Sequence, residues 1–215
     1  MRRPWTRILL ILLAVVLAYM LMVGLGLTGR HKGKSPKRIL VLNDFEDPAN
    51  DLQWATGGYV EMETSTENLT HGKRSAKARF LLAKQFNPTP TPGMVWAPAI
   101  SLSHRSVTTL TEFDWSAYDT LNLDLFNPGD AAVTAVLELS DGRGFVYDQA
   151  ISIDPKKFNN AAVTLADVKK QRLDLTSMDS ITLKPDVSKA VEPLELYLDY
   201  LRLEGEPILV KKKKS

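Results

Sequence analysis

Three aromatic residues of the sequence, Trp96, Tyr147 and Tyr197, are candidates for a surface that binds a carbohydrate. An aromatic ring stacks on the C–H face of a sugar, while polar neighbours such as Asp148 and Gln149 hydrogen-bond its hydroxyl groups. Tyr197 stands in a run where leucines alternate with polar residues, so its side chain is predicted to point away from the core. Aromatic residues are also ordinary constituents of strands, and this second interpretation stays open.

Motifs of common enzyme classes are missing from the sequence. It contains no Gly-x-Ser-x-Gly elbow, no glycine-rich phosphate loop and no His-Glu-x-x-His pair. There is no cysteine, and the three histidines, His31, His71 and His104, are scattered. A pair of acidic residues brought together by folding remains open among the 25 acids. We therefore expect a protein that is not an enzyme.

The charges are segregated along the chain. Eight of the 27 basic residues precede Ile39 and four more form the run 211–214, which leaves 15 basic residues against all 25 acidic residues in the rest of the chain. The central part therefore carries a net charge of about −10. Because such a body repels phosphate backbones, nucleic acid is excluded as an expected partner.

The sequence after position 38 has the pattern of short strands. In 121–125, apolar and polar residues alternate strictly, and turn sequences such as Asn127-Pro128-Gly129-Asp130 separate such runs. A short helical turn is expected near 166–173, and the prolines between 85 and 92 predict a loop. This spacing favours an all-β sandwich or barrel. The predicted strands are 39–45, 60–64, 75–82, 95–101, 120–126, 132–140, 145–153, 160–164, 180–185 and 194–203.

Four motifs in order give the sequence a recognisable resemblance. They are Asn43-Asp44-Phe45-Glu46, the segment 71–75 (HGKRS), the segment 114–121 (DWSAYDTL) and the segment 197–203 (YLDYLRL). From about Val41 to Leu203, the chain resembles the galactose-binding-like β-sandwich superfamily, which includes many carbohydrate-binding modules and the complex I intermediate-associated proteins. The resemblance implies a jelly-roll β-sandwich of two antiparallel sheets. It also implies that Trp115 packs inward instead of binding a sugar.

The resemblance further implies a structural calcium ion. Its ligands would be the carboxylates of Glu46 on the first strand and Asp199 on the last, with a backbone carbonyl from the neighbourhood of Lys73. Glu67 or Asp44 would complete the shell. Calcium binds six to eight oxygen ligands and accepts backbone carbonyls, so these residue types suit it. A solvated or hydrogen-bonded Asp199 without a metal is the alternative.

The amino-terminal region is predicted to enter a membrane. After the short basic segment 1–7, residues 8–27 carry no charge, and a run of this length is sufficient for a transmembrane helix. We therefore divide the chain into a transmembrane helix or signal anchor at 8–28, a basic linker at 29–38, a β-sandwich at 39–205 and a basic tail at 206–215. An uncleaved anchor is favoured over a cleaved export signal, because the run is long and Gly24-Leu25-Gly26 is its only tolerable cleavage site.

These observations predict a membrane-anchored, extracytoplasmic and non-catalytic carbohydrate-binding module. The β-sandwich would lie outside the cytoplasm, in the periplasm or at the cell surface. The alternative is a protein-interaction or complex-assembly module of the cell envelope that uses the same sandwich. Its partner would then be an envelope protein instead of a glycan.

Overall fold

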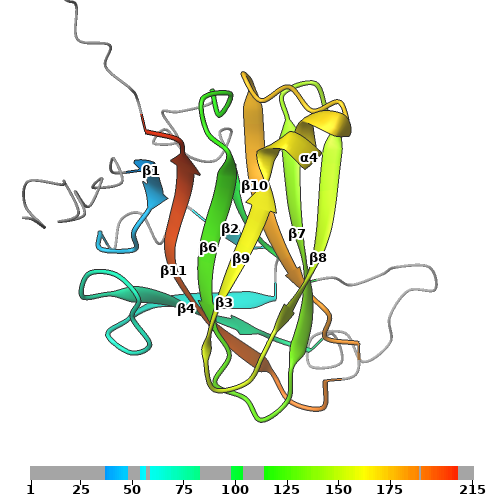
Figure 1. Cartoon of the computed structure of the whole chain (residues 1–215). Coiled ribbons are helices and arrows are strands. Elements are labelled where there is room, and N and C mark those ends of the chain that lie inside the picture. The colour runs from blue at the N-terminus through cyan, green and yellow to red at the C-terminus, as the bar shows by residue number, and fades with distance from the viewer. Residues whose placement is uncertain are drawn as a thin grey trace, which may run out of the picture. The chain divides into compact units, whose positions relative to one another are not determined.

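The computed structural model describes residues 37–47, 54–56, 59–82, 98–103, 114–188 and 190–207, which form two antiparallel sheets (Figure 1). The six-stranded sheet has the order β3-β4-β11-β6-β9, and β1 also pairs with β11. Its strands are β1 (Arg38–Asn43), β3 (Val60–Ser65), β4 (Ser75–Phe80), β6 (Thr120–Phe126), β9 (Phe158–Thr164) and β11 (Leu194–Gly205).

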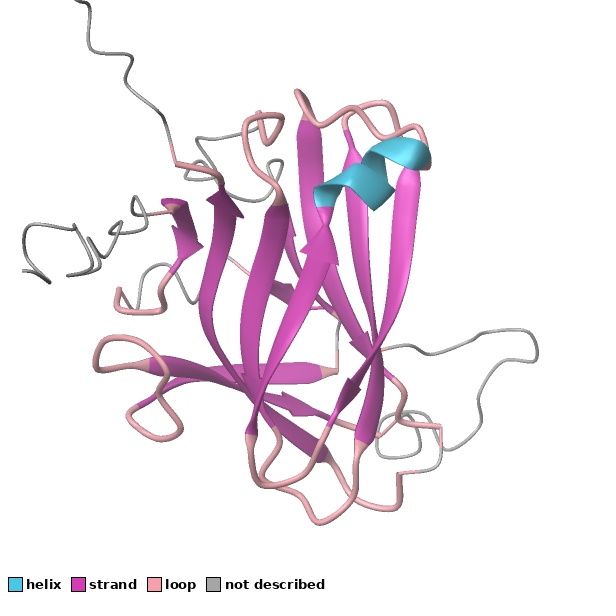
Figure 2. Cartoon of the chain, in the orientation of Figure 1, coloured by secondary structure: helices cyan, strands magenta, loops and turns pink. Residues whose placement is uncertain are grey.

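The second sheet contains five strands in the order β2-β5-β10-β7-β8. They are β2 (Ala55–Thr56), β5 (Ile100–Ser103), β7 (Val133–Asp141), β8 (Val146–Ile153) and β10 (Met178–Pro185). Among the described residues the one helix is α4 (Leu165–Lys170), which follows β9 directly (Figure 2). The structure thus confirms an all-β fold of two antiparallel sheets.

The core lies between the sheets and follows the alternation seen in the sequence. In β6, Leu121, Leu123 and Leu125 are at most 1% exposed, and in β7 the inward residues Leu137 and Leu139 are fully buried. Successive side chains of a strand point to opposite faces, so each strand contributes every second residue to this layer. Trp115 is 1% exposed and belongs to the same cluster, which confirms the prediction that its side chain packs inward.

One predicted strand differs from the structure, and one strand of the structure was not predicted. The strand expected at 95–101 lies partly outside the described residues, and the strand that is described, β5, starts only at Ile100. Pro98 has no N–H group to donate to a ladder, which agrees with a strand that begins only after this residue. The short strand β2 was missed because its two residues are too few for any periodicity to be visible.

The transmembrane helix at 8–28 remains a prediction, because it lies outside the described residues. Within the part of the chain that the structure describes, no helix is long and apolar enough to cross a membrane.

A buried carboxylate, Asp141, holds the β7–β8 hairpin against the loop that follows α4. Its side chain is 2% exposed, and its Oδ1 accepts the backbone N–H groups of Arg143 at 3.0 Å and Phe145 at 3.1 Å. Its Oδ2 accepts the Arg143 guanidinium at 2.8 Å and the N–H of Asp174 at 2.9 Å. Burial acts to raise the pKa of Asp141, but the hydrogen bonds from Asp174 and Arg143 outweigh it and hold the pKa below its usual value.

Replacement Asp141→Ala should lower the free energy of unfolding at pH 7 by about 3 kcal/mol, because it leaves the buried donors without an acceptor. An Asp whose pKa is lower in the folded state stabilises the fold above its unfolded pKa of about 3.9 and loses this effect as the pH falls through the folded value. The difference in the free energy of unfolding between wild type and variant should therefore become smaller below about pH 4. Denaturant unfolding at a series of pH values measures this difference.

The exposed Asp148 on β8 supplies the control. Asp148→Ala should change the stability by no more than about 0.5 kcal/mol at any pH. Equal losses in the two variants would contradict the role given to Asp141.

Candidate functional site

The loop 66–74, which connects β3 to β4, is held by two carboxylates that come from distant parts of the chain. Asp199 on β11 accepts the backbone N–H of Thr70 at 2.6 Å and that of His71 at 2.8 Å. Glu46, just after β1, accepts the N–H groups of Lys73 at 2.5 Å and Arg74 at 2.8 Å. The residues that the calcium prediction named therefore surround one loop, although they lie far apart in the sequence.

Asp199 reaches the loop because β11 contains a bulge. Between Asp199 and Arg202 the pairing with β6 shifts register, so that three steps along β11 oppose two steps along β6. Tyr200, inside the bulge, has a left-handed φ of 46°, a conformation that non-glycine residues adopt at an energetic cost. The bulge keeps Leu198 and Leu201 both in the core while Asp199 points to the opposite face.

One oxygen of Asp199 has no partner. The residue is 2% exposed, its Oδ2 accepts the bonds from the loop, and its Oδ1 is buried without any hydrogen bond among the described residues. A buried carboxylate oxygen without a donor is energetically unfavourable. A cation is one partner that such an oxygen could accept.

The position of the second carboxylate, Glu46, depends on the backbone conformation of its neighbour Phe45. Phe45 beside it has a left-handed φ of 57° and is fully buried against the Trp54 ring, with centroids 6.0 Å apart. The N–H groups of Lys73 and Arg74 lower the pKa of Glu46 below its usual value. Gly72 leaves room for this side chain, because a Cβ on Gly72 would lie 2.1 Å from Oε1 of Glu46 and would displace it.

A third carboxylate, Asp124 on β6, belongs to the same cluster and was not predicted. It faces Asp199 across the β6–β11 ladder, and the Thr70 hydroxyl lies 2.9 Å from an oxygen of each. Asp124 also accepts a bond from Asn160 at 2.6 Å and pairs with Arg202 at 3.2 Å. The outward phase of Asp124 in 121–125 was visible in the sequence, but its partner across the ladder was not.

The side chains of the cluster fit a cation in part. Carboxylate oxygens are the ligands that calcium prefers, and the free Oδ1 of Asp199 is suitably buried. Within the described ranges, however, no three acidic or histidine side chains gather as a metal site. A calcium ion here would need backbone carbonyls of the loop, which is the arrangement that the resemblance implies for Lys73.

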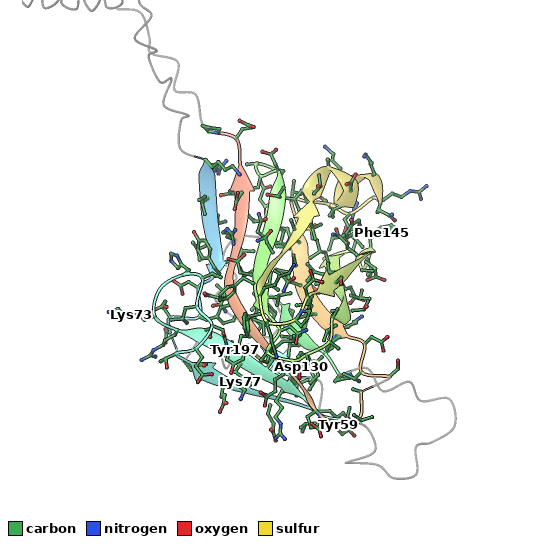
Figure 3. All side chains as sticks on the ribbon, turned by 60° about the horizontal axis from the view of Figure 1, so that its bottom comes forward. Tyr59, Lys73, Lys77, Asp130, Phe145 and Tyr197 are labelled. Carbon is green, nitrogen blue, oxygen red and sulfur yellow. The ribbon has the colours of Figure 1, made fainter. Side chains whose placement is uncertain are left out.

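The predicted sugar-stacking residue Tyr197 points away from the core, as its sequence phase indicated, but it is covered. It is 5% exposed, its hydroxyl donates to Glu67 at 2.9 Å and the edge of Phe126 meets its ring. Figure 3 shows Tyr197 beside Lys77, its neighbour across the β4–β11 ladder. Burial first, and then the bond to Glu67, raise the pKa of Tyr197. The ring presents no open face to a sugar in this structure.

The other two candidates lie elsewhere. Tyr147 on β8 is half-buried against the core, and its hydroxyl donates to Gln149 at 3.2 Å. Gln149 in turn donates to the carbonyl of Ala162 at 3.1 Å, so the pair bridges the edges of the two sheets. Trp96 lies outside the described residues. The three aromatics therefore do not form one described surface, and their sugar-binding role stays a prediction.

The outer face of the five-stranded sheet carries hydroxyl groups and charged side chains. Two hydroxyl pairs cross it: Ser101 lies 2.9 Å from Thr182, and Ser140 lies 2.6 Å from Ser180. Lys184 of β10 forms an ion pair with Glu138 of β7, which also faces Asp148 across the β7–β8 ladder. This surface offers hydroxyl, carboxylate and ammonium groups on one sheet face.

The outer face of the six-stranded sheet is organised differently. Lys77 and Arg79 on β4 alternate with Glu61, Glu63 and Glu195 on the neighbouring strands, at N–O distances from 3.3 to 3.9 Å. The cluster of Asp124 and Asp199 lies on the same outer face. The charged groups of this face are therefore largely paired with one another.

The fold is similar to solved carbohydrate-binding modules. A family 11 carbohydrate-binding module from Clostridium thermocellum, in complex with a β-1,3-1,4-mixed-linked tetrasaccharide, superposes with a TM-score of 0.53 at 15% identity, over 79% of this chain and 96% of that one. A Clostridium thermocellum xylanase segment with a family 22 module, complexed with xylohexaose, gives 0.53 at 8% identity, over 83% of this chain and 30% of that one.

An exo-β-agarase is also similar, with a TM-score of 0.58 at 16% identity, and there the match spans 78% of this chain but only 25% of the enzyme. No family model matches the sequence, and no curated protein does. The structural likenesses confirm a β-sandwich fold of the kind that the four motifs indicated.

The contact between Gly72 and Glu46 can be tested with a pair of glycines. Gly72 and Gly144 both have left-handed φ angles, of 63° and 86°, but a Cβ on Gly144 meets nothing within 4 Å. Gly144→Ala should cost about 1 kcal/mol from backbone strain alone. Gly72→Ala should cost more than Gly144→Ala, because its Cβ also displaces Glu46 from its two N–H donors.

Denaturant unfolding of the two variants gives both values under the same conditions. If Gly72→Ala lowers the free energy of unfolding by no more than Gly144→Ala does, the hydrogen bonds from the loop to Glu46 contribute nothing to stability.

Proposed function

We propose that this protein is a non-catalytic carbohydrate-binding module, anchored in a membrane, with its sandwich outside the cytoplasm. The observation that carries the proposal is the polar outer face of the five-stranded sheet, on a fold similar to modules solved with bound oligosaccharides. Sugars have many hydroxyl groups and need closely spaced donors and acceptors, which this face provides. The glycan itself is the part of the proposal that experiment must supply.

The sugar-binding groups would be those that remain accessible on this face. Glu138 and Lys184 are half-buried and Asp148 is exposed, so their polar atoms can exchange water for sugar hydroxyls. Trp96, four residues before β5, is the proposed stacking residue. The rings of Tyr147 and Tyr197 could stack on a sugar only if the side chains that cover them moved away. We therefore assign these two residues a secondary role in binding.

Catalysis is not part of the proposal. Asp124 and Asp199 face each other across the β6–β11 ladder, yet Asp199 is 2% exposed and both carboxylates accept several hydrogen bonds. A pair of catalytic carboxylates in a glycosidase must contact the scissile bond and a water molecule. These two are positioned to hold the loop 66–74 instead.

The membrane anchor and the location rest on the sequence. The uncharged run 8–27 is long enough to span a bilayer, and a short basic segment precedes it. We propose that it stays attached as a signal anchor and that the sandwich lies in the periplasm or at the cell surface.

We also propose that calcium binds between Glu46 and Asp199. The buried Oδ1 of Asp199 supports this, since a cation would supply the partner that the oxygen lacks. Backbone carbonyls near Lys73 would contribute further ligands. The ion would stabilise the loop and would take no part in chemistry.

Calcium should raise the melting temperature of the full chain relative to a chelator. At a calcium concentration about 100 times the dissociation constant, the stabilisation would be about 2.7 kcal/mol. Asp199→Asn should abolish the calcium-dependent rise, whereas Asp130→Asn, at an 89% exposed side chain, should keep it. A wild-type protein that melts equally with calcium and with chelator would rule out the ion.

The glycan proposal is tested by screening the full chain, in detergent, on a glycan array. Trp96→Ala and the double variant Glu138→Ala, Asp148→Ala should each weaken binding at least tenfold, about 1.4 kcal/mol. The double variant Glu61→Ala, Glu63→Ala, on the other sheet, should bind as wild type does. Folded protein that binds no glycan would favour the alternative, a protein-interaction or complex-assembly module of the cell envelope.

A further inference from the structure

The described chain enters and leaves the sandwich at the same end. Arg38, at the start of β1, pairs with Gly205, the last residue of β11. Residues 28–36 connect Lys37 to the apolar run 8–27, and the lysines 211–214 follow a few residues after Glu206. Basic sequence therefore flanks the sandwich on both sides of this one point.

Three further segments belong to this end, as a chain of contacts shows. The Arg38 guanidinium lies 4.5 Å from the centre of the Tyr118 ring, and the N–H of Trp115 donates to Leu175 at 2.7 Å. From the loop after α4, the carbonyl of Ser177 accepts the N–H of Gly142 at 2.8 Å. We call this end, formed by Arg38, Gly205 and residues 115–119, 141–146 and 165–177, the entry end. In Figure 1, α4 and the ends of β1 and β11 lie at the top of the view.

The β7–β8 hairpin exposes two apolar side chains at the entry end. Phe145 is 43% and Val146 is 48% exposed. Arg143 lies over the Phe145 ring at 5.1 Å, and its guanidinium donates to the carbonyl of Arg172 at 2.6 Å. An exposed aromatic residue beside arginines is the combination that inserts into the headgroup region of a bilayer.

The entry end lacks the excess of acid that the rest of the body carries. It holds five basic residues (Arg38, Arg143, Lys169, Lys170 and Arg172) and four acidic residues (Asp119, Asp141, Asp167 and Asp174), and Asp119 and Asp174 line a cavity with Lys169. Asp141 is bonded to Arg143, Asp167 pairs with Lys170 at 2.7 Å and Asp174 bonds the Thr176 hydroxyl at 2.7 Å. No described carboxylate forms an ion pair with Lys169 or Arg172. These two exposed cations can therefore bind lipid phosphate without first breaking an ion pair.

The exposed apolar residue Val191 has acidic neighbours instead of basic ones. Val191 is 81% exposed, but it lines a cavity at the opposite end of the sandwich together with Asp130, Asp186 and Glu192. Acidic neighbours disfavour contact with an anionic surface. In Figure 3, Phe145 lies well apart from Asp130.

We propose that the entry end is a docking surface for an anionic lipid bilayer, with Phe145 and Val146 in the headgroup region and Lys169 and Arg172 on lipid phosphates. This inference rests on the membrane anchor of the proposed function. Nine residues between the apolar run and Lys37 span at most about 30 Å, so the anchor keeps this end within reach of the bilayer. A tether of that length makes a weak contact effective, because the local concentration of lipid is high.

The orientation has a functional consequence. Both sheet faces would stand roughly perpendicular to the membrane, because the strands β1 and β11 start or end at the docked end. The hydroxyl-rich face of the five-stranded sheet would then stay open to a ligand.

The absence of cysteine from the chain makes a direct test feasible. Phe145→Cys, and Val146→Cys as a second position, would each be labelled with an environment-sensitive fluorophore in the full chain. The protein would be reconstituted into vesicles of phosphatidylcholine with phosphatidylglycerol that carry a nitroxide on the lipid headgroup. The expected result is a blue shift and a loss of emission at both positions, and neither effect for a label at Val191→Cys.

The charge contribution is tested in the same vesicles. Lys169→Glu, Arg172→Glu should reverse the loss of emission, and salt should weaken it, because the Debye length falls from about 8 Å at physiological ionic strength to about 3 Å at 1 M. Vesicles of phosphatidylcholine alone should give less quenching.

Flotation of the same samples separates the two proposals. Protein that floats with the vesicles, but whose labels at 145 and 146 behave as the label at 191 does, overturns the docking surface and leaves the anchor intact. Protein that does not float overturns the anchor and, with it, the docking surface.

Discussion

The bulge in β11 is the local constraint on which the candidate site depends. β11 is hydrogen-bonded to β1, β4 and β6, so any change in its register is felt across the six-stranded sheet. The leucines at 196 and 198 and those at 201 and 203 can share one core only if an extra residue is inserted between them. Tyr200 is that residue, and its strained φ is maintained because the buried leucines on both sides over-determine it.

The bulge also accounts for the polar cluster on the outer face. It brings Asp199 under the loop 66–74, where the loop N–H groups converge on it, and it sets Arg202 beside Asp124. Two carboxylates facing each other across a ladder repel, so their proximity needs compensation by Arg202, Asn160 and the loop. The Tyr200 ring is enclosed between the His71 ring at 4.1 Å and the Arg202 guanidinium at 4.5 Å. Strain, charge and stacking are thus concentrated at one point of the structure.

The two sheets divide the proposed tasks between them. The outer polar groups of the six-stranded sheet form ion pairs with one another and hold the loop. On the five-stranded sheet, Asp148 is exposed and Glu138 is half-buried, so their carboxylates remain accessible. The chain enters and leaves at one end, so neither outer face is crossed by the described terminal residues. In the function that we propose, this arrangement leaves the outer face of the five-stranded sheet open while the entry end faces the membrane.

The sequence by itself determined the fold class and most of the strands. Alternation in runs such as 121–125 and 133–139 depends only on the geometry of a strand, and the order of the four motifs was specific enough to indicate the superfamily. The resemblance also implied that Glu46, Asp199 and the segment around Lys73 belong together. The phase break between Leu198 and Leu201 was present in the sequence as well, and it would have predicted the bulge.

Only the tertiary structure decided which side chains are covered. Strand phase placed Tyr197 outside the core, but a side chain's exposure depends on neighbours from other strands, and Phe126 and Glu67 bury this ring. Asp124 joined the cluster for the same reason, since its partners Thr70, Asn160 and Arg202 come from three other parts of the chain. Periodicity reports the face of a strand, whereas burial and hydrogen bonding across strands are set by long-range register, which no local pattern encodes.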